Sequence, residues 1–317
     1  MIARRCVVLT LALSSCAGGA WSALGLEGLG RAKPVEVREL LDSDPEPTRP
    51  ETFPELLREA DQSRDAGDVP RAAWKYLRAL RLKPTSALPG ERIGLVLLEE
   101  GDYERAEVTL EDVVSAHPDS SLGQCGLGLA LLQQGEFDRA ELHLKRAQRL
   151  APDNVLVLLA LGVLSDRRAE PRVASQYYRR GLSVAPRSPD LLNNLGMSLL
   201  MAGDAASAVE YLRKASRLAP EDPVGHNNLG IALGRLGRYD EALEEFRSAG
   251  NEAAAQNNLG YAYLLNGELE SALARFELAL ESATGRARLP IIQNMRRARS
   301  EARQATRAVP RETTAAP

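Results

Sequence analysis

Four columns of glycine, alanine or proline recur along this chain every 34 positions, and this periodicity constrains the fold more than any other feature of the sequence. Two columns hold glycine, a third holds alanine and a fourth holds proline. The columns are Gly94, Gly128, Gly162, Gly196 and Gly230; Gly67, Gly101, Gly135, Gly203 and Gly237, with Ala169 filling the one gap; Ala72, Ala106, Ala140, Ala174, Ala208 and Ala242; and Pro84, Pro118, Pro152, Pro186 and Pro220. Such regularity indicates one structural unit repeated along the chain.

Each column has a physical role in a pair of helices. A glycine inside a helix costs about 1 kcal/mol relative to alanine, so the first column predicts close packing against a second helix, with the alanine column supplying the contact. The second glycine suits a left-handed turn that ends the first helix, and the proline ends the second because it cannot continue the hydrogen-bond ladder. Apolar residues recur at helical spacing between these positions, as in Leu192, Leu195 and Leu199. The unit is therefore two antiparallel helices of about 12–14 residues, and the predicted fold class is all-α.

Composition agrees with this prediction and limits the function. Only 4% of the residues are aromatic, and the formal net charge of −3 argues against a nucleic-acid binder held by bulk electrostatics. The charge is uneven, because residues 33–59 are rich in acids while residues 286–312 hold eight arginines against two acids. Charged ends of this kind usually form solvated segments.

The repeat pattern resembles the tetratricopeptide repeat (TPR) family over residues 53–285, about three quarters of the chain. The resemblance implies an α-α superhelix, or solenoid, of about seven helix-turn-helix repeats, beginning near residues 53, 87, 121, 155, 189, 223 and 253. In the fourth repeat, Pro171 takes over the start of the second helix. Residues 286–308 are expected to form a capping helix that covers the exposed apolar end, followed by a disordered tail over residues 309–317.

The spacing breaks once, near the end of the array. "NNLG" occurs at residues 193–196, 227–230 and 257–260, so the last step is 30 residues rather than 34. Four residues are close to one helical turn, which shifts the facing direction by only about 40°. We therefore expect the array to continue through Ser248–Ala255 with a tighter join between its last two repeats.

The N-terminus has the pattern of an export signal. Arg4 and Arg5 precede a short apolar run, and "LSSC" at residues 13–16 resembles the lipobox of bacterial lipoproteins. This predicts a signal peptide over residues 1–15, lipidation of Cys16 and a flexible tether over residues 16–52; an ordinary secretory signal is the alternative. Ala17 favours the outer membrane over the inner membrane, with the protein facing the periplasm, and Cys125 is left as the one unmodified thiol.

Nothing in the sequence points to catalysis. The three histidines, His117, His143 and His226, lie in separate repeats, and no Cys/His spacing suits a metal. The glycine runs do not follow a strand, which argues against a dinucleotide loop, and Cys125 lies in an apolar helical context. We predict a non-enzyme with no cofactor, no metal and no small-molecule substrate.

Recognition of another protein or peptide is the expected function. In the TPR family the first helix of each repeat lines a concave surface, which the resemblance carries over to Asn193, Asn194, Asn227, Asn228, Asn257 and Asn258, with Met197, Arg235 and Tyr261 as further candidates. The second asparagine of each pair could instead bond within the solenoid. The lysines of the family's carboxylate clamp are missing at the matching positions, which argues against chaperone C-terminal peptides.

The combination of lipobox, repeats and basic last helix resembles the TPR lipoproteins of tight-adherence (Tad/Flp) pilus systems, most clearly in "FRSAGNEAAAQNNLGYAYLLNGELESALARFELAL". That resemblance implies a lipid-anchored scaffold that helps to assemble or localise pilus or secretion components. Two alternatives remain: a pilotin-like or general envelope-assembly lipoprotein, and an adaptor that docks cell-wall enzymes.

Overall fold

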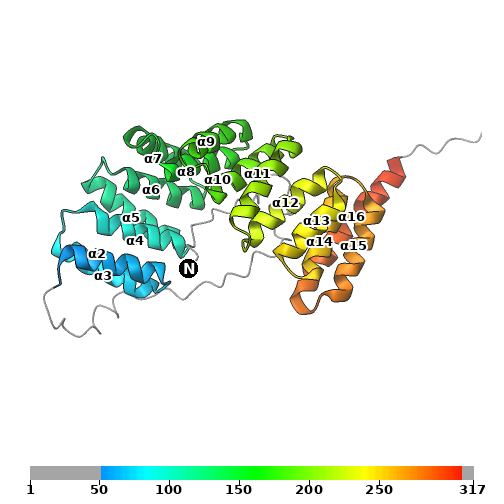
Figure 1. Ribbon diagram of the computed structural model, residues 1–317, viewed down its shortest axis with the longest axis horizontal. Coiled ribbons are helices and arrows are strands. Elements are labelled where there is room, and N and C mark those ends of the chain that lie inside the picture. Colours follow the sequence, from blue (N-terminus) through cyan, green and yellow to red (C-terminus); the bar gives the residue numbers. More distant parts are fainter. Residues whose placement is uncertain (1–50, 309–317) are drawn as a thin grey trace, which may run out of the picture. The chain divides into compact units, whose positions relative to one another are not determined.

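The computed structural model describes residues 51–308, all of whose regular elements are helices (Figure 1). Cys16, the signal peptide, the tether before residue 51 and the tail after residue 308 lie outside the described residues. The described part divides into two compact units after Ala185, and each is treated separately below. Unit 1 covers residues 51–185 and unit 2 covers residues 186–308.

Unit 1 contains four helix pairs and unit 2 contains three pairs and a last helix. The pairs of unit 1 are α2 (Phe53–Asp65) with α3 (Val69–Leu82), α4 (Ala87–Glu99) with α5 (Tyr103–Ala116), α6 (Ser121–Gln134) with α7 (Phe137–Leu150), and α8 (Val155–Arg167) with α9 (Pro171–Val184). Those of unit 2 are α10 (Pro189–Met201) with α11 (Ala205–Leu218), α12 (Pro223–Arg235) with α13 (Tyr239–Ala249), and α14 (Glu252–Leu265) with α15 (Leu269–Ser282), followed by the short 3-10 helix η2 (Gly285–Ala287) and α16 (Arg288–Ala308). The predicted all-α fold of seven helix pairs and a capping helix is confirmed.

The turn inside each pair is built as the second glycine column predicts. The glycines at this position have φ between 71° and 88°, in the left-handed region that favours glycine. Ala169 fills the gap in the column and adopts the same conformation, with φ 59°, the one non-glycine residue with positive φ among residues 51–308. Next in the chain, Asp68, Asp102 and Asp204 each accept a backbone N–H of the following helix, which caps its first turn.

The first glycine column meets a large side chain, which corrects the expectation that alanine supplies the contact. A Cβ on Gly162 would lie 2.2 Å from the ring of Tyr178, and one on Gly196 would lie 2.5 Å from Leu212. The partner stands 16 positions later in each of the six pairs that have this glycine, as in Gly230 with Phe246. The alanine column contributes its backbone instead, since the carbonyl of Ala208 would lie 3.2 Å from the same added Cβ on Gly196. The glycine therefore leaves room for a buried Leu, Tyr or Phe.

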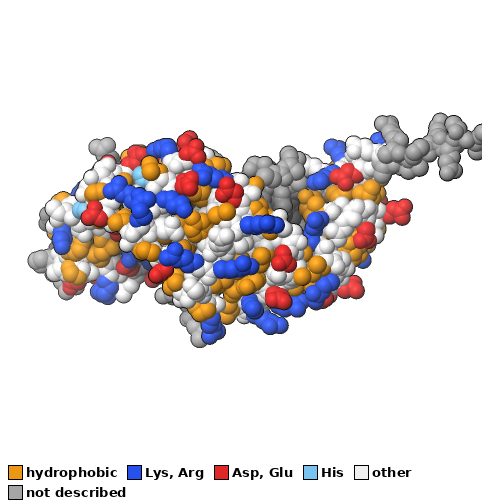
Figure 2. All heavy atoms as spheres, turned by 90° about the horizontal axis from the view of Figure 1, so that it is seen from above, with side chains coloured by type: hydrophobic (Ala, Val, Ile, Leu, Met, Phe, Trp, Pro, Cys, Tyr) orange, Lys and Arg blue, Asp and Glu red, His pale blue; other side chains and the backbone are white. Residues whose placement is uncertain are grey.

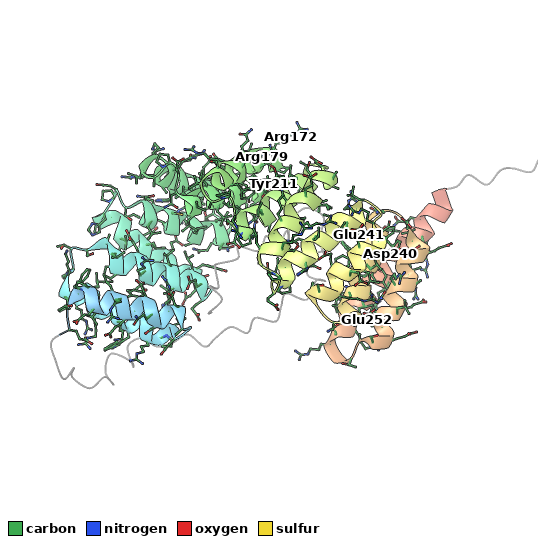
Figure 3. The ribbon with its side chains drawn as sticks, in the orientation of Figure 1. Arg172, Arg179, Tyr211, Asp240, Glu241 and Glu252 are labelled. Carbon is green, nitrogen blue, oxygen red and sulfur yellow. The ribbon has the colours of Figure 1, made fainter. Side chains whose placement is uncertain are left out.

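The short step lies in α13 and in the connection that follows it. The second helices of the other pairs have 14 residues, whereas α13 has 11 and is joined to α14 by Gly250 and Asn251 alone. Arg247 spans this join, with its Nε 2.9 Å from Glu252 Oε2 (Figure 3 labels Glu252). The array continues through the join, since α13 and α14 pack together.

The last helix covers the apolar end of unit 2. Ile291, Met295 and Ala298 of α16 are buried against a cluster that includes Phe276 and Ala279 of α15. Arg288 donates to the carbonyls of Leu280 and Ala283, which satisfies acceptors at the end of α15.

Candidate partner-binding face

Within each unit, first helices of successive pairs contact one another: α4, α6 and α8 in unit 1, and α10, α12 and α14 in unit 2. The last helix, α16, contacts α14. The predicted asparagines lie on α10, α12 and α14, because each stands two or three residues before the glycine that packs against the second helix. In unit 2 they form two chains of side-chain hydrogen bonds that run from helix to helix.

The shorter chain joins α12 to α10. Asn228 donates from Nδ2 to Oδ1 of Asn193 over 2.9 Å. Both residues are half-buried. The second asparagine of one pair thus bonds to the first asparagine of the pair before it.

The longer chain joins α16, α14 and α12. Asn294 donates to Oδ1 of Asn257 over 3.0 Å, Asn257 donates to Oδ1 of Asn258 over 3.4 Å, and Asn258 donates to Oδ1 of Asn227 over 2.8 Å. Asn257 and Asn294 are each 5% exposed. This chain of hydrogen bonds begins at the buried Asn294 of α16 and ends at Asn227 of α12.

In both chains the donor that joins two helices lies on the later helix and the acceptor on the earlier one, so each chain ends on an amide whose oxygen accepts a hydrogen bond. The Nδ2 groups of Asn193 and Asn227 have no hydrogen-bond partner within residues 51–308, and both side chains keep some exposure. An amide whose oxygen accepts a hydrogen bond is polarised, so its N–H groups become better donors. The two terminal amides are therefore suited to a ligand that supplies acceptors, such as main-chain carbonyls or a carboxylate.

Four other predicted residues lie beneath this face. Asn194 is 5% exposed and donates to the carbonyl of Asp190, one turn earlier on its own helix. Met197 and Tyr261 are 5% and 7% exposed, and Asn257 is the buried link already described. These residues leave little surface for direct contact and hold the first helices in place. Direct contact with a partner stays a prediction for Asn193, Asn227, Asn228 and Asn258.

Arg235 is exposed at the end of α12, where its Nη1 donates to the carbonyl of Leu265 over 3.1 Å. This bond satisfies an acceptor at the C-terminus of α14 and joins two successive first helices. Arg235 therefore makes a hydrogen bond between helices and is also exposed at the edge of the asparagine-bearing face.

His226 directly precedes the asparagine pair of α12. Its Nδ1 lies 2.6 Å from Glu245 Oε2, and its Nε2 lies 3.0 Å from the carbonyl of Pro220. Burial disfavours the charged imidazolium, but these two hydrogen bonds outweigh burial and raise the pKa of His226 above its ordinary value. His226 therefore ties α12 to α13 rather than facing a ligand.

Asn294 is the member of this site that the sequence did not reveal. It lies in α16, outside the 34-residue columns, so no repeat position marked it. A signal was present, because an asparagine among the apolar residues Ile291, Ile292 and Met295 needs a buried partner.

The remaining candidates for chemistry are Cys125 and any group of side chains that could bind a metal ion. Cys125 is buried, and burial raises the pKa of its thiol to about 12, which keeps it protonated and unreactive. Within residues 51–308, no three His, Cys, Asp or Glu side chains are grouped closely enough to hold a metal ion. In the same range no helix combines the length and apolarity needed to cross a bilayer.

The sequence of residues 55–265 matches a TPR family model described as the cilia and flagella-associated protein 70 C-terminal domain. Among curated proteins, none matches the sequence of this chain.

Several solved structures have a similar fold. Cut9 in the APC/C Cut9–Hcn1 hetero-tetramer has a TM-score of 0.62 and 19% identity, with 83% of this chain and 51% of that chain covered. The pilF protein of Pseudomonas aeruginosa has a TM-score of 0.53 and 19% identity, covering 68% and 97%. PilW, described as a widely conserved type IV pilus biogenesis factor, has a TM-score of 0.56 and 16% identity, covering 65% and 98%. At these identities the likeness establishes the fold alone.

Proposed function

The chain belongs to the TPR family of the cilia and flagella-associated protein 70 C-terminal domain, and we propose that unit 2 binds an extended segment of a partner protein through the free amide donors of Asn193 and Asn227. TPR solenoids are protein–protein interaction scaffolds, so a protein partner is the expected ligand class. The observation that carries the proposal is the common direction of the two amide chains, which leaves a donor at the end of each.

A partner that fits must present acceptors at the spacing of two adjacent first helices. An extended polypeptide does so with its main-chain carbonyls, which need no particular side chain. The half-buried oxygens of the same asparagines are already occupied, so the terminal amides act toward the partner as donors only.

The test replaces only the donor atoms. In the double variant Asn193→Asp and Asn227→Asp, the carboxylates still accept from Asn228 and Asn258 but offer no N–H to a partner. We expect at least about a tenfold loss of affinity for the partner, because two hydrogen bonds are lost and two negative charges face its carbonyls. Affinity is measured by calorimetry with partners recovered by pull-down, and helicity and Tm are measured beside it.

The matched control makes the same chemical change elsewhere. Gln293→Glu and Gln304→Glu convert two exposed amides of α16 to carboxylates. This control should bind as the unmodified chain does. Equal weakening by both double variants, or no weakening by either, would contradict the proposal.

We further propose that the scaffold is lipid-anchored through Cys16 in the cell envelope, in the outer membrane facing the periplasm, and assists a tight-adherence pilus or secretion system. The lipobox-like "LSSC" and the similarity of the last repeats to tight-adherence lipoproteins support this. PilW, which has a similar fold, is described as a widely conserved type IV pilus biogenesis factor.

Two measurements test this finer proposal. Cys16→Ala should move the protein from the membrane fraction to the soluble fraction, and continued membrane association would argue against lipid anchoring. Pull-down from envelope extract should recover pilus or secretion components, and recovery should fall with Asn193→Asp and Asn227→Asp. Capture of cell-wall enzymes alone would favour the adaptor alternative, and capture of other envelope-assembly proteins alone would favour a pilotin-like role.

A further inference from the structure

The outer side of α16 carries an unusual concentration of arginine. Within the side chains that the structure describes, α16 has one acidic residue, Glu301, against five exposed arginines: Arg288, Arg296, Arg297, Arg299 and Arg303. We propose that three of them, Arg296, Arg299 and Arg303, form a binding surface for the phosphate groups of an anionic bilayer. These three residues are called the arginine face below.

The arginine face is set by helical spacing. At 100° per residue the three side chains fall within an arc of about 60° and extend about 10 Å along the helix axis. The buried residues Ile291, Met295 and Ala298 pack against α15 and centre about 100° around the helix from the arginine face. Leu289, which is 60% exposed, falls on the same side as the arginines at the start of the helix.

The other two arginines of α16 whose side chains the structure describes, Arg288 and Arg297, have structural partners. Arg288 binds carbonyls at the end of α15, and Arg297 Nε lies 2.9 Å from Glu301 Oε1 on the opposite flank. On the arginine face, Arg299 has one ion-pair partner, with its Nη2 4.0 Å from Oε1 of Glu277. Arg296 and Arg303 have no acidic partner within the described residues. The charge of this face is therefore largely available to an external anion.

Phosphate is the anion that this chemistry suits. A guanidinium is always charged and offers a planar fork of donors that matches phosphate oxygens, and every cation of the face is an arginine. Interfaces with proteins depend on buried aromatic or arginine anchors seated in pockets, whereas this face has no aromatic residue and lies on a single convex helix. A bilayer surface needs no pocket, and an exposed leucine beside basic residues favours the interface between headgroups and acyl chains.

The test uses the full chain with Cys16→Ser, so that lipid modification plays no part. Its partition onto phosphatidylglycerol/phosphatidylethanolamine vesicles, measured by co-sedimentation, is compared with that of the same chain carrying Arg296→Gln, Arg299→Gln and Arg303→Gln. Each arginine near an anionic surface contributes enough for roughly a fivefold change in partition, so the triple variant should bind roughly 100-fold more weakly. Phosphatidylcholine vesicles should bind both proteins equally weakly.

A matched control removes the same charge from the second helices of two other pairs. Arg149, Arg172 and Arg179 are exposed on α7 and α9 and have no ion-pair partner within residues 51–308, and Arg172 and Arg179 project outward from α9 in Figure 3. Changing these three to Gln should leave anionic-vesicle binding within about threefold of the parent chain. The Tm of both triple variants should match that of the parent, since neither set is buried.

Two results would overturn the proposal. One is an equal loss of vesicle binding in both triple variants, which would mean that net charge alone acts. The other is binding to anionic vesicles that is the same for the parent chain and the arginine-face variant. A parent chain that binds polyglutamate, an acidic polypeptide without phosphate, but does not bind anionic vesicles would overturn the proposal in the same way. The assay contains no protein partner, so its failure leaves the proposal for Asn193 and Asn227 standing.

Discussion

The first helices of the two units join their neighbours through different chemistry. At the positions where unit 2 has Asn193 and Asn194, α8 of unit 1 has Leu159 and Ala160, 34 residues earlier. Leu159 is 7% exposed and Ala160 is fully buried, so α8 is held at this row by apolar packing. The equivalent residues of α4 are polar, since Glu91 accepts a hydrogen bond from Ser120 and Arg92 lies 3.8 Å from Asp61, so the contrast with unit 2 applies to α8. In unit 2 the same row is held by hydrogen bonds between amides.

What the units share is as informative as this difference. Both place a glycine of the first helix against a large side chain 16 positions later, as in Gly162 with Tyr178 and Gly196 with Leu212. This contact is therefore part of the fold, whereas the residues of the first-helix face vary without changing it. A face that is free to vary is the part of a repeat that evolves to suit a partner. On the surface seen in Figure 2, basic and acidic side chains are interspersed over both units, so neither unit presents a single charge there.

The largest effect is expected from removing the side chain opposite the glycine. Tyr178→Ala in unit 1 and Leu212→Ala in unit 2 should each lower the free energy of unfolding by about 3–5 kcal/mol, because both side chains are fully buried and leave a cavity. Urea unfolding followed by circular dichroism measures the loss. Leu142→Ala, at a position that is 66% exposed, is the control and should change stability by less than about 0.5 kcal/mol. A small loss for either buried variant would show that the shared contact is not structural in that unit.

Breaking the amide chain should cost less and should act only in unit 2. Asn294→Ala removes the donor to Asn257, whose buried oxygen then lacks that bond, and this should cost about 1–3 kcal/mol. Combining it with Asn257→Ala should cost less than the sum of the single losses by at least about 0.5 kcal/mol. Strict additivity in this double-mutant cycle would mean that the two amides do not interact. Gln293→Ala, at an exposed neighbouring position, is the control.

A smaller effect of opposite sign is expected at the turn of the fourth pair. Ala169→Gly relieves a left-handed conformation and should raise the free energy of unfolding by about 1 kcal/mol, whereas Gly135→Ala at the equivalent turn of the third pair should lower it by a similar amount. Thermal melting of both variants measures the difference. A loss of stability in Ala169→Gly would contradict this account of the turn.

The smallest effect is a pH dependence in unit 2. The folded-state pKa of His226 is raised, so its interaction with Glu245 stabilises the fold fully below the unfolded pKa and is lost as the pH rises through the folded pKa. His226→Gln should therefore cost about 0.5 kcal/mol at about pH 5.5 and less at about pH 8.5. Urea unfolding at both values measures this, and a cost that grows with pH would have the wrong sign.

The sequence was sufficient for the fold because every structural role in the repeat falls at a fixed position. Gly203 and Pro220 end consecutive helices by backbone geometry, which depends on residue type and hardly on neighbours. The contact opposite the first glycine was predicted only in part: the alanine column contributes its backbone, but a large side chain four positions later fills the space. Helix packing depends on which side chain points across, and spacing alone did not fix that.

The candidate site was only partly predictable. The positions of Asn193 and Asn227 followed from the repeat, but the direction of the hydrogen bonds follows from contacts between helices. Asn294 lies beyond the last repeat, so its role became visible only when α16 was seen against α14. The sequence also could not separate exposed candidates from buried ones such as Met197, because both kinds share one helix face.

The short α13 and its connection, Gly250 and Asn251, also bear on how such arrays change length. A deletion of four residues removes slightly more than one helical turn, so residues on either side change their angular phase by only about 40°. The first helix that follows still places Gly260 against Phe276 at the usual separation of 16 residues. In repeat arrays of this kind, a length change close to a whole number of helical turns therefore preserves the orientation of the later repeats. Insertions or deletions of three or four residues at a second helix should be tolerated, whereas those of one or two residues should rotate all later repeats out of alignment.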